Sequence, residues 1–352
     1  MTLEELIANI RPLDQVAMQA ARARQDNLTK PQGSLGRLEA LSIQIAGITG
    51  PIAPQVQHKV VTVMAGDHGV TAEGVSAYPS EVTPQMVANF LTGGAAINVL
   101  ARHAGARVVV VDMGVAADIP AHPDLISKKI AYGTGNIVRE PAMTREQTIR
   151  SILAGVEIVE AEITRGLDIL ATGDMGIGNT TPSAAIAASI LEQAPGEIVG
   201  RGTGVDDAGL QRKIRAVEQA LALHHPNPKD GLDVLAKVGG FEIGGLAGAM
   251  LAAAAHRRPV VVDGFISTAA ALLAVQIAPP VRDYLIAAHR SQERGHRLML
   301  EWLGLQPLLD LELRLGEGTG AVLALSLIEA ACKLLNEMAT FGQAGVSEKD
   351  PA

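Results

Sequence analysis

The 352-residue sequence has few aromatic residues, a single cysteine and no excess of basic residues. Phe, Trp and Tyr together make up 2% of the chain, so the core must be built from Ala, Val, Leu and Ile. A core of small aliphatic side chains suits helices packed closely on a sheet. Cys332 stands alone, which excludes an intrachain disulfide and a cysteine-based zinc site. We expect its thiol to be an inert part of a helical core.

The charge balance and the lack of a long apolar segment argue against two classes of partner. Lys and Arg number 29 against 37 Asp and Glu, and the net charge is -8. Such a chain has little attraction for nucleic acid or for an anionic membrane surface. The N-terminus lacks the basic and apolar segments of a signal peptide, and the runs 246–255 and 265–281 are too short or too polar to span a bilayer. We expect a cytoplasmic protein that binds neither nucleic acid nor membranes.

Short apolar runs alternate with helical patterns in the middle of the chain. The runs show no polar alternation, which is typical of strands buried on both faces of a parallel sheet, and they lie at 60–64, 107–111, 167–171, 259–262 and 284–287. Between them we predict a helix with Thr83 as N-cap, one that begins at Pro182 and one from about 207 to 223. The two ends of the chain show helical signals only.

These patterns predict an α/β fold with a doubly wound, mostly parallel sheet. We assign residues 55–300 to a large α/β domain that contains the active-site crevice. Residues 1–54 plus 301–352 are predicted to form a smaller helical domain from both termini.

Each apolar run ends in an acid or a histidine, usually beside glycine. The five residues are Asp67, Asp112, Asp174, Asp263 and His289. In an open parallel sheet, ligands bind outside the carboxyl ends of the strands. A single Asp after a strand is usually an N-cap or turn residue, but five polar strand ends together predict one shared crevice.

Four loops combine glycine with small polar residues, at 133–136, 173–181, 200–207 and 316–321. Glycine lets backbone N–H groups approach a phosphate, and a helix N-terminus that follows adds positive partial charge. The loop at 173–181 leads from a strand into a helix, as such a cradle does, although any one loop could be a tight turn. None has the P-loop lysine pattern or completes the dinucleotide pattern G-x-G-x-x-G, so neither ATP hydrolysis nor NAD chemistry is favoured.

Glu317 lies between two glycines just before the last long helical pattern. Its carboxylate could act as a general base if no cation pairs with it. It could equally cap the helix that starts near Thr319, because acids are favoured at helix N-termini. The residues alone leave both roles open.

Two other functions are compatible with the residues. The nine histidines show no metal-binding spacing, yet some could meet strand-end acids in the crevice. A metal-dependent hydrolase would use Asp67, His68, Asp112 and His289, with His296 nearby. A nucleotide-binding protein without catalytic activity would bind ligand and show no turnover.

Ten ordered segments give the sequence a specific resemblance to one family. They are KPQGSLGRLE (30–39), AGDHGV, GVSAYPSEVTPQM, GTGNI, GDMGIGNTTPSAA, GRGTGVDD, VGGFEIGGLAGAML, VVVDGFIS, AHRSQERGH and LRLGEGTGAVLAL. Over about residues 28–346 the chain resembles the nicotinate-nucleotide:dimethylbenzimidazole phosphoribosyltransferases of cobalamin lower-ligand synthesis. The resemblance implies a homodimer with a Rossmann-like large domain. It also implies transfer of the 5-phosphoribosyl group from nicotinate mononucleotide to 5,6-dimethylbenzimidazole or a related azaarene, with α-ribazole 5′-phosphate and nicotinate as products and no cofactor or metal.

The resemblance also implies roles for individual residues. The family's base in the LGEGTG segment corresponds to Glu317, and Asp174 would lie over the reacting centre, where Glu is common in the family. The donor and its phosphate would meet Gly176, Gly178, Asn179, Thr180, Gly202, Gly204, Lys213, Asp263 and Ser291. The benzimidazole pocket would include Ser80, Met86 and Leu315. The segment 30–39 could be structural.

Overall fold

The computed structural model describes residues 2–50 and 54–347. Six parallel strands form one sheet in the order β3-β2-β1-β4-β5-β6. They are β1 (Lys59–Gly66), β2 (Ala106–Gly114), β3 (Leu125–Ser127), β4 (Ile169–Met175), β5 (Val260–Val262) and β6 (Leu285–Ala287). This is the strand order of a doubly wound fold, so the predicted fold class is confirmed. All five predicted strands form, and the sequence patterns miss only β3 among the described strands.

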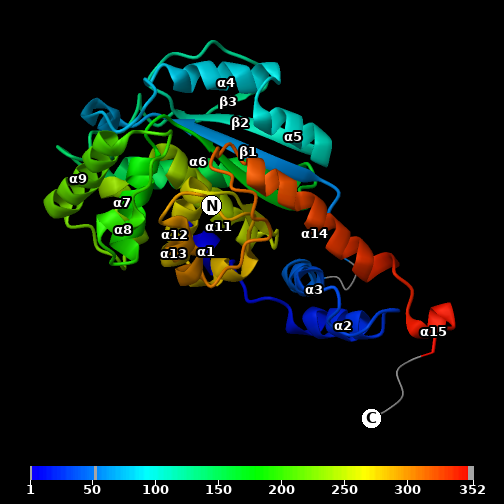
Figure 1. Cartoon of the computed structure of the whole chain (residues 1–352). Helices are drawn as coiled ribbons and strands as arrows, with labels where there is room; N and C mark the ends of the chain where they lie inside the picture. The colour runs from blue at the N-terminus through cyan, green and yellow to red at the C-terminus, as the bar shows by residue number, and fades with distance from the viewer. Residues whose placement is uncertain (1, 51–53, 348–352) are drawn as a thin grey trace.

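Helices cover both faces of the sheet (Figure 1). Alternate side chains of β1 enter two separate cores: Val61 and Val63 join one, and Val60 and Met64 join the other. The first core includes residues of α3 (Arg37–Thr49), α4 (Val82–Thr92), α5 (Ala96–Ala104) and α14 (Thr319–Glu337). The second includes residues of α1 (Leu3–Ala8), α6 (Arg145–Thr164), α7 (Thr180–Ile190), α8 (Pro195–Ile198), α9 (Asp207–His224), α10 (Gly231–Val238), α11 (Phe241–Ala255), α12 (Phe265–Ile277) and α13 (His296–Leu303). Burial on both faces explains why the strands read as unbroken apolar runs.

A small helical group lies beyond the sheet (Figure 1). It consists of α2 (Gln15–Asp26), α3, α15 (Phe341–Ala344) and the end of α14, and its core joins Ala21, Ala46 and Leu335. The predicted division does not follow this group closely, because α1 packs on α11 and residue 300 lies inside α13. Residues 1, 51–53 and 348–352 of the predicted small domain lie outside the described residues. Two 3-10 helices, η1 (Gly69–Glu73) and η2 (Pro279–Tyr284), complete the described elements.

Helix α14 is long and apolar enough to cross a membrane by length and composition alone. In the fold, 56% of that window is buried, because the helix packs on the sheet and on α3 and α5. Cys332 lies buried in this helix, and burial raises the pKa of its thiol to about 12. The expectation of a core cysteine is therefore confirmed.

Two predicted helix starts differ from the structure. Helix α4 has Glu81 as N-cap, and the hydroxyl of Thr83 instead accepts a hydrogen bond of 3.1 Å from the Ile177 amide. Thr83 therefore ties α4 to the loop that follows β4. Helix α7 begins at Thr180, so Pro182 is its third residue.

Candidate active site

A cavity of about 680 Å³ lies at the carboxyl edge of the sheet, beside the loops that follow β4, β5 and β6. Strand order reverses between β1 and β4, and ligands of open α/β sheets bind at such a reversal. Nine of the predicted site residues line the cavity: Met86, Asp174, Gly176, Asn179, Thr180, Gly202, Ser291, Leu315 and Glu317.

Glu317 occupies a left-handed backbone conformation, with φ of 62°. One of its carboxylate oxygens accepts a hydrogen bond of 3.4 Å from the Ile97 amide, in the first turn of α5. Burial raises the pKa of the Glu317 carboxyl, the Ile97 amide opposes that rise, and the charge of Asp263 adds to it. Glu317 forms no ion pair with any described residue, so its carboxylate is suited to accept a proton.

Asp263, rather than Glu317, caps α14. Its carboxylate accepts hydrogen bonds of 3.2 Å from the Gly318 amide and 2.9 Å from the Ala321 amide. His289 Nε2 lies 3.7 Å from the same carboxylate. Of the two roles that the sequence leaves open for Glu317, capping of α14 is therefore wrong. Asp263 is 1% exposed and is not among the residues that line the cavity.

Asp174, the next-to-last residue of β4, has a buried carboxyl close to Glu317. The Asn179 side-chain amide donates a hydrogen bond of 2.9 Å to it. Gly316 passes close by, since a Cβ built there would lie 3.4 Å from both carboxylate oxygens. Burial raises the pKa of Asp174 well above its ordinary value, and the charges of Asp263, Glu242 and Glu317 add to the rise. Asp174 and Glu317 thus share a cavity in which a cationic ligand would stabilise their charged forms.

Thr180, Gly202 and Lys213 form a second group at the N-terminus of α7. Lys213 Nζ donates a hydrogen bond of 2.8 Å to the Thr180 hydroxyl, and a Cβ at Gly202 would lie 2.6 Å from Nζ. Burial lowers the pKa of Lys213 to about 8, while the charge of Glu293 opposes the shift. A buried ammonium beside a glycine loop and a helix N-terminus suits an anion such as a phosphate.

Three other predicted residues lie in or near these loops without lining the cavity. Gly178 has φ of 88° and faces Thr71, while Gly204 has φ of 102° and faces open space. The Ser80 hydroxyl donates a hydrogen bond of 3.2 Å to the Thr71 hydroxyl. Ser80 thus bonds to Thr71 and does not line the cavity. Tyr78 and Val82, two positions before and after it in the chain, do line the cavity.

A buried His–Glu pair lies directly beneath Gly176. His68 Nε2 and Glu242 Oε1 are 2.6 Å apart, and a Cβ at Gly176 would meet the Gly66 carbonyl oxygen at 2.3 Å. Burial would lower the pKa of His68, but the charge of Glu242 raises it above its ordinary value. The pair fixes the floor of the loop that follows β4, and only glycine fits above it. Sequence reasoning treated His68 as a metal ligand and missed Glu242, which lies 174 positions away.

The prediction that all five polar strand ends line one crevice is wrong. Of the five, only Asp174 and His289 line the cavity. Asp67 accepts a hydrogen bond of 2.8 Å from the Ala116 amide, and Asp112 accepts from the Val115 amide at 2.9 Å. Both carboxylates thus serve the loop after β2. The glycine loop at 133–136 also lies away from the cavity, against Asp67 and Gly69.

The residues of the alternative metal site are not brought together. Within 2–50 and 54–347, no group of three or more His, Cys, Asp or Glu residues is placed to hold a metal ion. His68 pairs with Glu242, and His289 with Asp263. The hydrolase hypothesis therefore has no site in the described part of the chain.

Several lining residues were not predicted from the sequence. They are Tyr78, Val82, Met175, Ile177, Thr203, Gly264, Phe265, Ile266, Glu293, Glu312, Leu313, Arg314 and Gly316. Arg314 donates a hydrogen bond of 3.1 Å from Nη1 to the Gly202 carbonyl, which joins the loop before α14 to the loop at 200–207. Many of these residues lie next to predicted site residues in the chain. Their closeness in sequence is the signal from which they could have been predicted.

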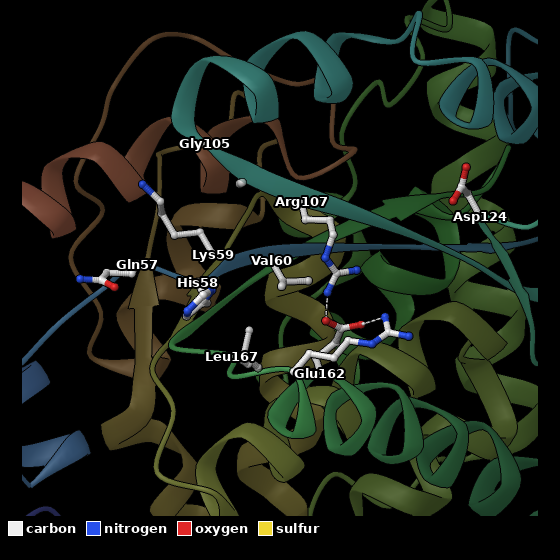
Figure 2. Close-up of a pocket in the computed structure, with 11 residues that line it drawn as sticks. Gln57, His58, Lys59, Val60, Gly105, Arg107, Asp124, Glu162 and Leu167 are labelled. Atoms are coloured by element: carbon white, nitrogen blue, oxygen red, sulfur yellow. Dashed lines mark hydrogen bonds and ion pairs between the residues drawn. The ribbon is translucent and has the colours of Figure 1, made fainter.

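A second cavity, of about 690 Å³, lies at the amino edge of the sheet, where β1 and β2 begin. Figure 2 shows the side chains of Arg107 and Glu162 pointing toward one another there. The other oxygen of Glu162 lies 3.1 Å from Nη1 of Arg165. Lys59 in turn pairs with Glu329. Two guanidinium groups neutralise Glu162, so the buried carboxylate that lines this cavity is not free to act as a base.

Three comparisons with known proteins place the chain among the phosphoribosyltransferases. A family model described as "Phosphoribosyltransferase" matches residues 10–346. A nicotinate-nucleotide–dimethylbenzimidazole phosphoribosyltransferase of Roseiflexus sp. (strain RS-1) is 66% identical over 347 residues, which are 99% of this chain and 98% of that protein. The corresponding protein of Geobacter sulfurreducens is 56% identical over 348 residues, 99% of each chain. The crystal structure of CobT from Thermus thermophilus matches with a TM-score of 0.92 at 51% identity, over 95% of this chain and 100% of that one.

Proposed function

The chain belongs to the phosphoribosyltransferase family, and from that membership we propose that it transfers the 5-phosphoribosyl group of nicotinate mononucleotide to 5,6-dimethylbenzimidazole. The products are α-ribazole 5′-phosphate and nicotinate, and the reaction serves cobalamin lower-ligand synthesis. The names of relatives that match almost the whole chain support the choice of substrates. The observation that carries the proposal for this chain is Glu317, a buried carboxylate in the cavity with no cationic partner among the described residues.

The donor phosphate would bind where the buried ammonium lies. Gly176, Thr180 and Gly202 line this part of the cavity, with Lys213 behind them. The backbone N–H groups at the start of α7 and the Lys213 ammonium would balance the phosphate charge. Asp174 would then face the donor's pyridinium ring and ribose, and its negative form would be stabilised by the positive charge of the pyridinium. Gly178, Asn179, Gly204 and Ser291 would contribute loop contacts around the donor.

The acceptor would lie against the apolar side chains of the cavity. Met86, Val82 and Leu315 supply this surface, with Ser80 next to it. One ring nitrogen of the benzimidazole attacks C1′ of the ribose, and the bond from C1′ to the pyridinium nitrogen breaks with its electron pair going to nicotinate. The proton on the other ring nitrogen passes to Glu317, which acts as general base.

The assembly and the location of the protein are also part of this proposal. We infer a homodimer from the family resemblance, and a cytoplasmic location from an acidic chain whose long apolar helix α14 packs in the core. Light scattering on a size-exclusion column should give twice the chain mass of 36.6 kDa. A monomer at assay concentration would contradict the dimer.

The test of the function is an assay with nicotinate mononucleotide and 5,6-dimethylbenzimidazole in the presence of EDTA, with both products followed by chromatography. We expect equal amounts of nicotinate and α-ribazole phosphate. Nicotinate alone would mean that water or another base is the acceptor, and a panel of azaarenes would then identify it. Binding without turnover would contradict the enzyme.

A further inference from the structure

Glu317 stands in a backbone conformation that needs support from its surroundings. Three consecutive residues, Gly316, Glu317 and Gly318, have φ of 84°, 62° and 88°. A residue with a side chain is disfavoured in this left-handed region, and it stays there only where other contacts determine its position. The contacts that hold residues 318–321 therefore decide where the Glu317 carboxylate points.

Asp263 supplies these contacts from the end of β5. Its two oxygens accept hydrogen bonds from the amides of Gly318 and Ala321. Its own amide donates a hydrogen bond of 3.2 Å to the Thr172 hydroxyl in β4. The carboxylate thus joins the sheet to the residue that directly follows Glu317.

His289 lies beside Asp263 on the side of the cavity. Its Nε2 lies 3.7 Å from the Asp263 carboxylate, and the ring is 2% exposed. A Cβ at Gly320 would lie 2.0 Å from the ring, and one at Gly264 would lie 3.2 Å from Nε2. The ring is therefore clamped between two glycines, and it forms part of the cavity wall beside the first turn of α14.

The geometry leads to one inference, which rests on the proposed function. We propose that Asp263 and His289 form a positioning pair for the general base: Asp263 anchors the backbone after Glu317, and His289 keeps Asp263 in place as a carboxylate. Neither residue takes the proton from the acceptor. The pair sets the direction of the Glu317 carboxylate toward the cavity.

The surrounding charges fit this role. Besides His289, the titratable groups that act on Asp263 or are acted on by it are Asp174 and Glu317. Burial raises the pKa of Asp263, and His289 together with the backbone amides of α14 opposes that rise. Removal of His289 should therefore let Asp263 take up a proton at higher pH, and a protonated Asp263 loses acceptor strength toward Gly318.

A double-mutant cycle separates positioning from general stabilisation. In the wild-type background, Asp263→Asn should lower kcat by about 100-fold, because a misplaced catalytic group costs about that much, while both KM values stay within about threefold. In the Glu317→Gln background, Asp263→Asn should change kcat by less than about threefold, because its effect passes through Glu317. All rates are measured on protein shown to be folded by circular dichroism.

Asp112→Asn is a matched control for Asp263→Asn. Asp112 lies near the end of a strand, is 2% exposed and accepts hydrogen bonds from two backbone amides, those of Gly114 and Val115, with Lys129 Nζ 3.1 Å away in the place of His289. It serves the loop after β2 and does not line the cavity. Asp112→Asn should lower the melting temperature and keep kcat within about threefold of the wild type.

His289→Gln provides the same test if Asp263→Asn does not fold. We expect a roughly tenfold lower kcat and an acid limb of the kcat profile shifted to higher pH. His296→Gln is its control: burial lowers the pKa of His296 to about 3, so the ring is neutral, and it bonds to Thr268 and Ser291 rather than to Asp263. The acid limb should not move in this variant.

Two results would overturn the positioning pair while the base stands. One is an equal loss of kcat from Asp263→Asn with and without Glu317→Gln. The other is a loss of kcat from Asp112→Asn as large as that from Asp263→Asn. Full activity of Glu317→Gln would instead overturn the proposed base, and the pair with it.

Discussion

Two cavities of similar size lie at opposite edges of the same sheet, about 680 Å³ at the carboxyl edge and about 690 Å³ at the amino edge. At the carboxyl edge, Asp174 and Glu317 are buried and form no ion pair with any described residue. At the amino edge, the buried Glu162 pairs with Arg107 (Figure 2) and also with Arg165. Because the two cavities have nearly the same volume, cavity volume does not identify the active site. The proposed site is marked instead by a buried carboxylate with raised proton affinity, a group suited to act as the base of the proposed reaction.

The largest expected effect comes from removing the carboxylate at each edge in turn. Glu317→Gln should keep donor binding and lower kcat by roughly 10² to 10⁴-fold, the range of a general base. Glu162→Gln should leave kcat within about threefold and lower the melting temperature, because Arg107 and Arg165 lose their shared partner. Steady-state kinetics and thermal unfolding of both variants check this. The comparison breaks if the two variants lose similar activity, or if Glu317→Gln stays within tenfold of the wild type.

The next effect concerns the buried ammonium behind the glycine loops. Lys213→Ala should raise the donor KM by about 10- to 100-fold, the contribution of a charged hydrogen bond, and leave the acceptor KM nearly unchanged. The pKa of Lys213 is lowered to about 8, so its charge is present below that pH and is lost above it. In the wild type, kcat/KM for the donor should therefore fall as the pH rises through about 8.

The same pH dependence should disappear from kcat/KM for the donor in Lys213→Ala. Arg107→Ala supplies the control from the amino edge, where a guanidinium lies in the other cavity. It should leave both KM values unchanged. Equal increases of donor and acceptor KM in Lys213→Ala would place this lysine away from the phosphate.

The smallest expected effect concerns the apolar wall. Leu315 is 58% exposed and lines the cavity, whereas Leu311 is 52% exposed and does not. Leu315→Ala should raise the acceptor KM by roughly 5- to 10-fold through lost apolar contact, without a change in donor KM. Leu311→Ala should change neither value. If both substitutions behave alike, the acceptor does not lie against Leu315.

The fold was largely predictable from the sequence, because strands buried on both faces appear as apolar runs. Strand β3 is the exception: it has three residues at the sheet edge, its side chains are half-buried or exposed, and no apolar run marks it. The helix start at Thr83 was misplaced because a hydroxyl that looks like an N-cap instead binds the amide of Ile177, far away in the sequence.

The site was predictable only where chemistry is local in the chain. The glycine loop at 173–181 and Glu317, which has a glycine on each side, are recognisable in the sequence. The structure brings both to one cavity. The sequence does not show that Asp263, and not Glu317, caps α14. The capping depends on a hydrogen bond between residues 55 positions apart, from the Gly318 amide to Asp263. The pairing of His68 with Glu242 could not be predicted for the same reason, because the two residues lie 174 positions apart.

Amide hydrogen exchange with nicotinate mononucleotide bound, in the absence of acceptor, tests the central claim most directly. The claim is that the donor binds at the carboxyl edge, against the loops at 174–181 and 201–205. We predict slower exchange in these two segments and in the first turn of α9, with no change at 57–60 and 105–107. Protection confined to 57–60 and 105–107, at the amino edge, would contradict the account.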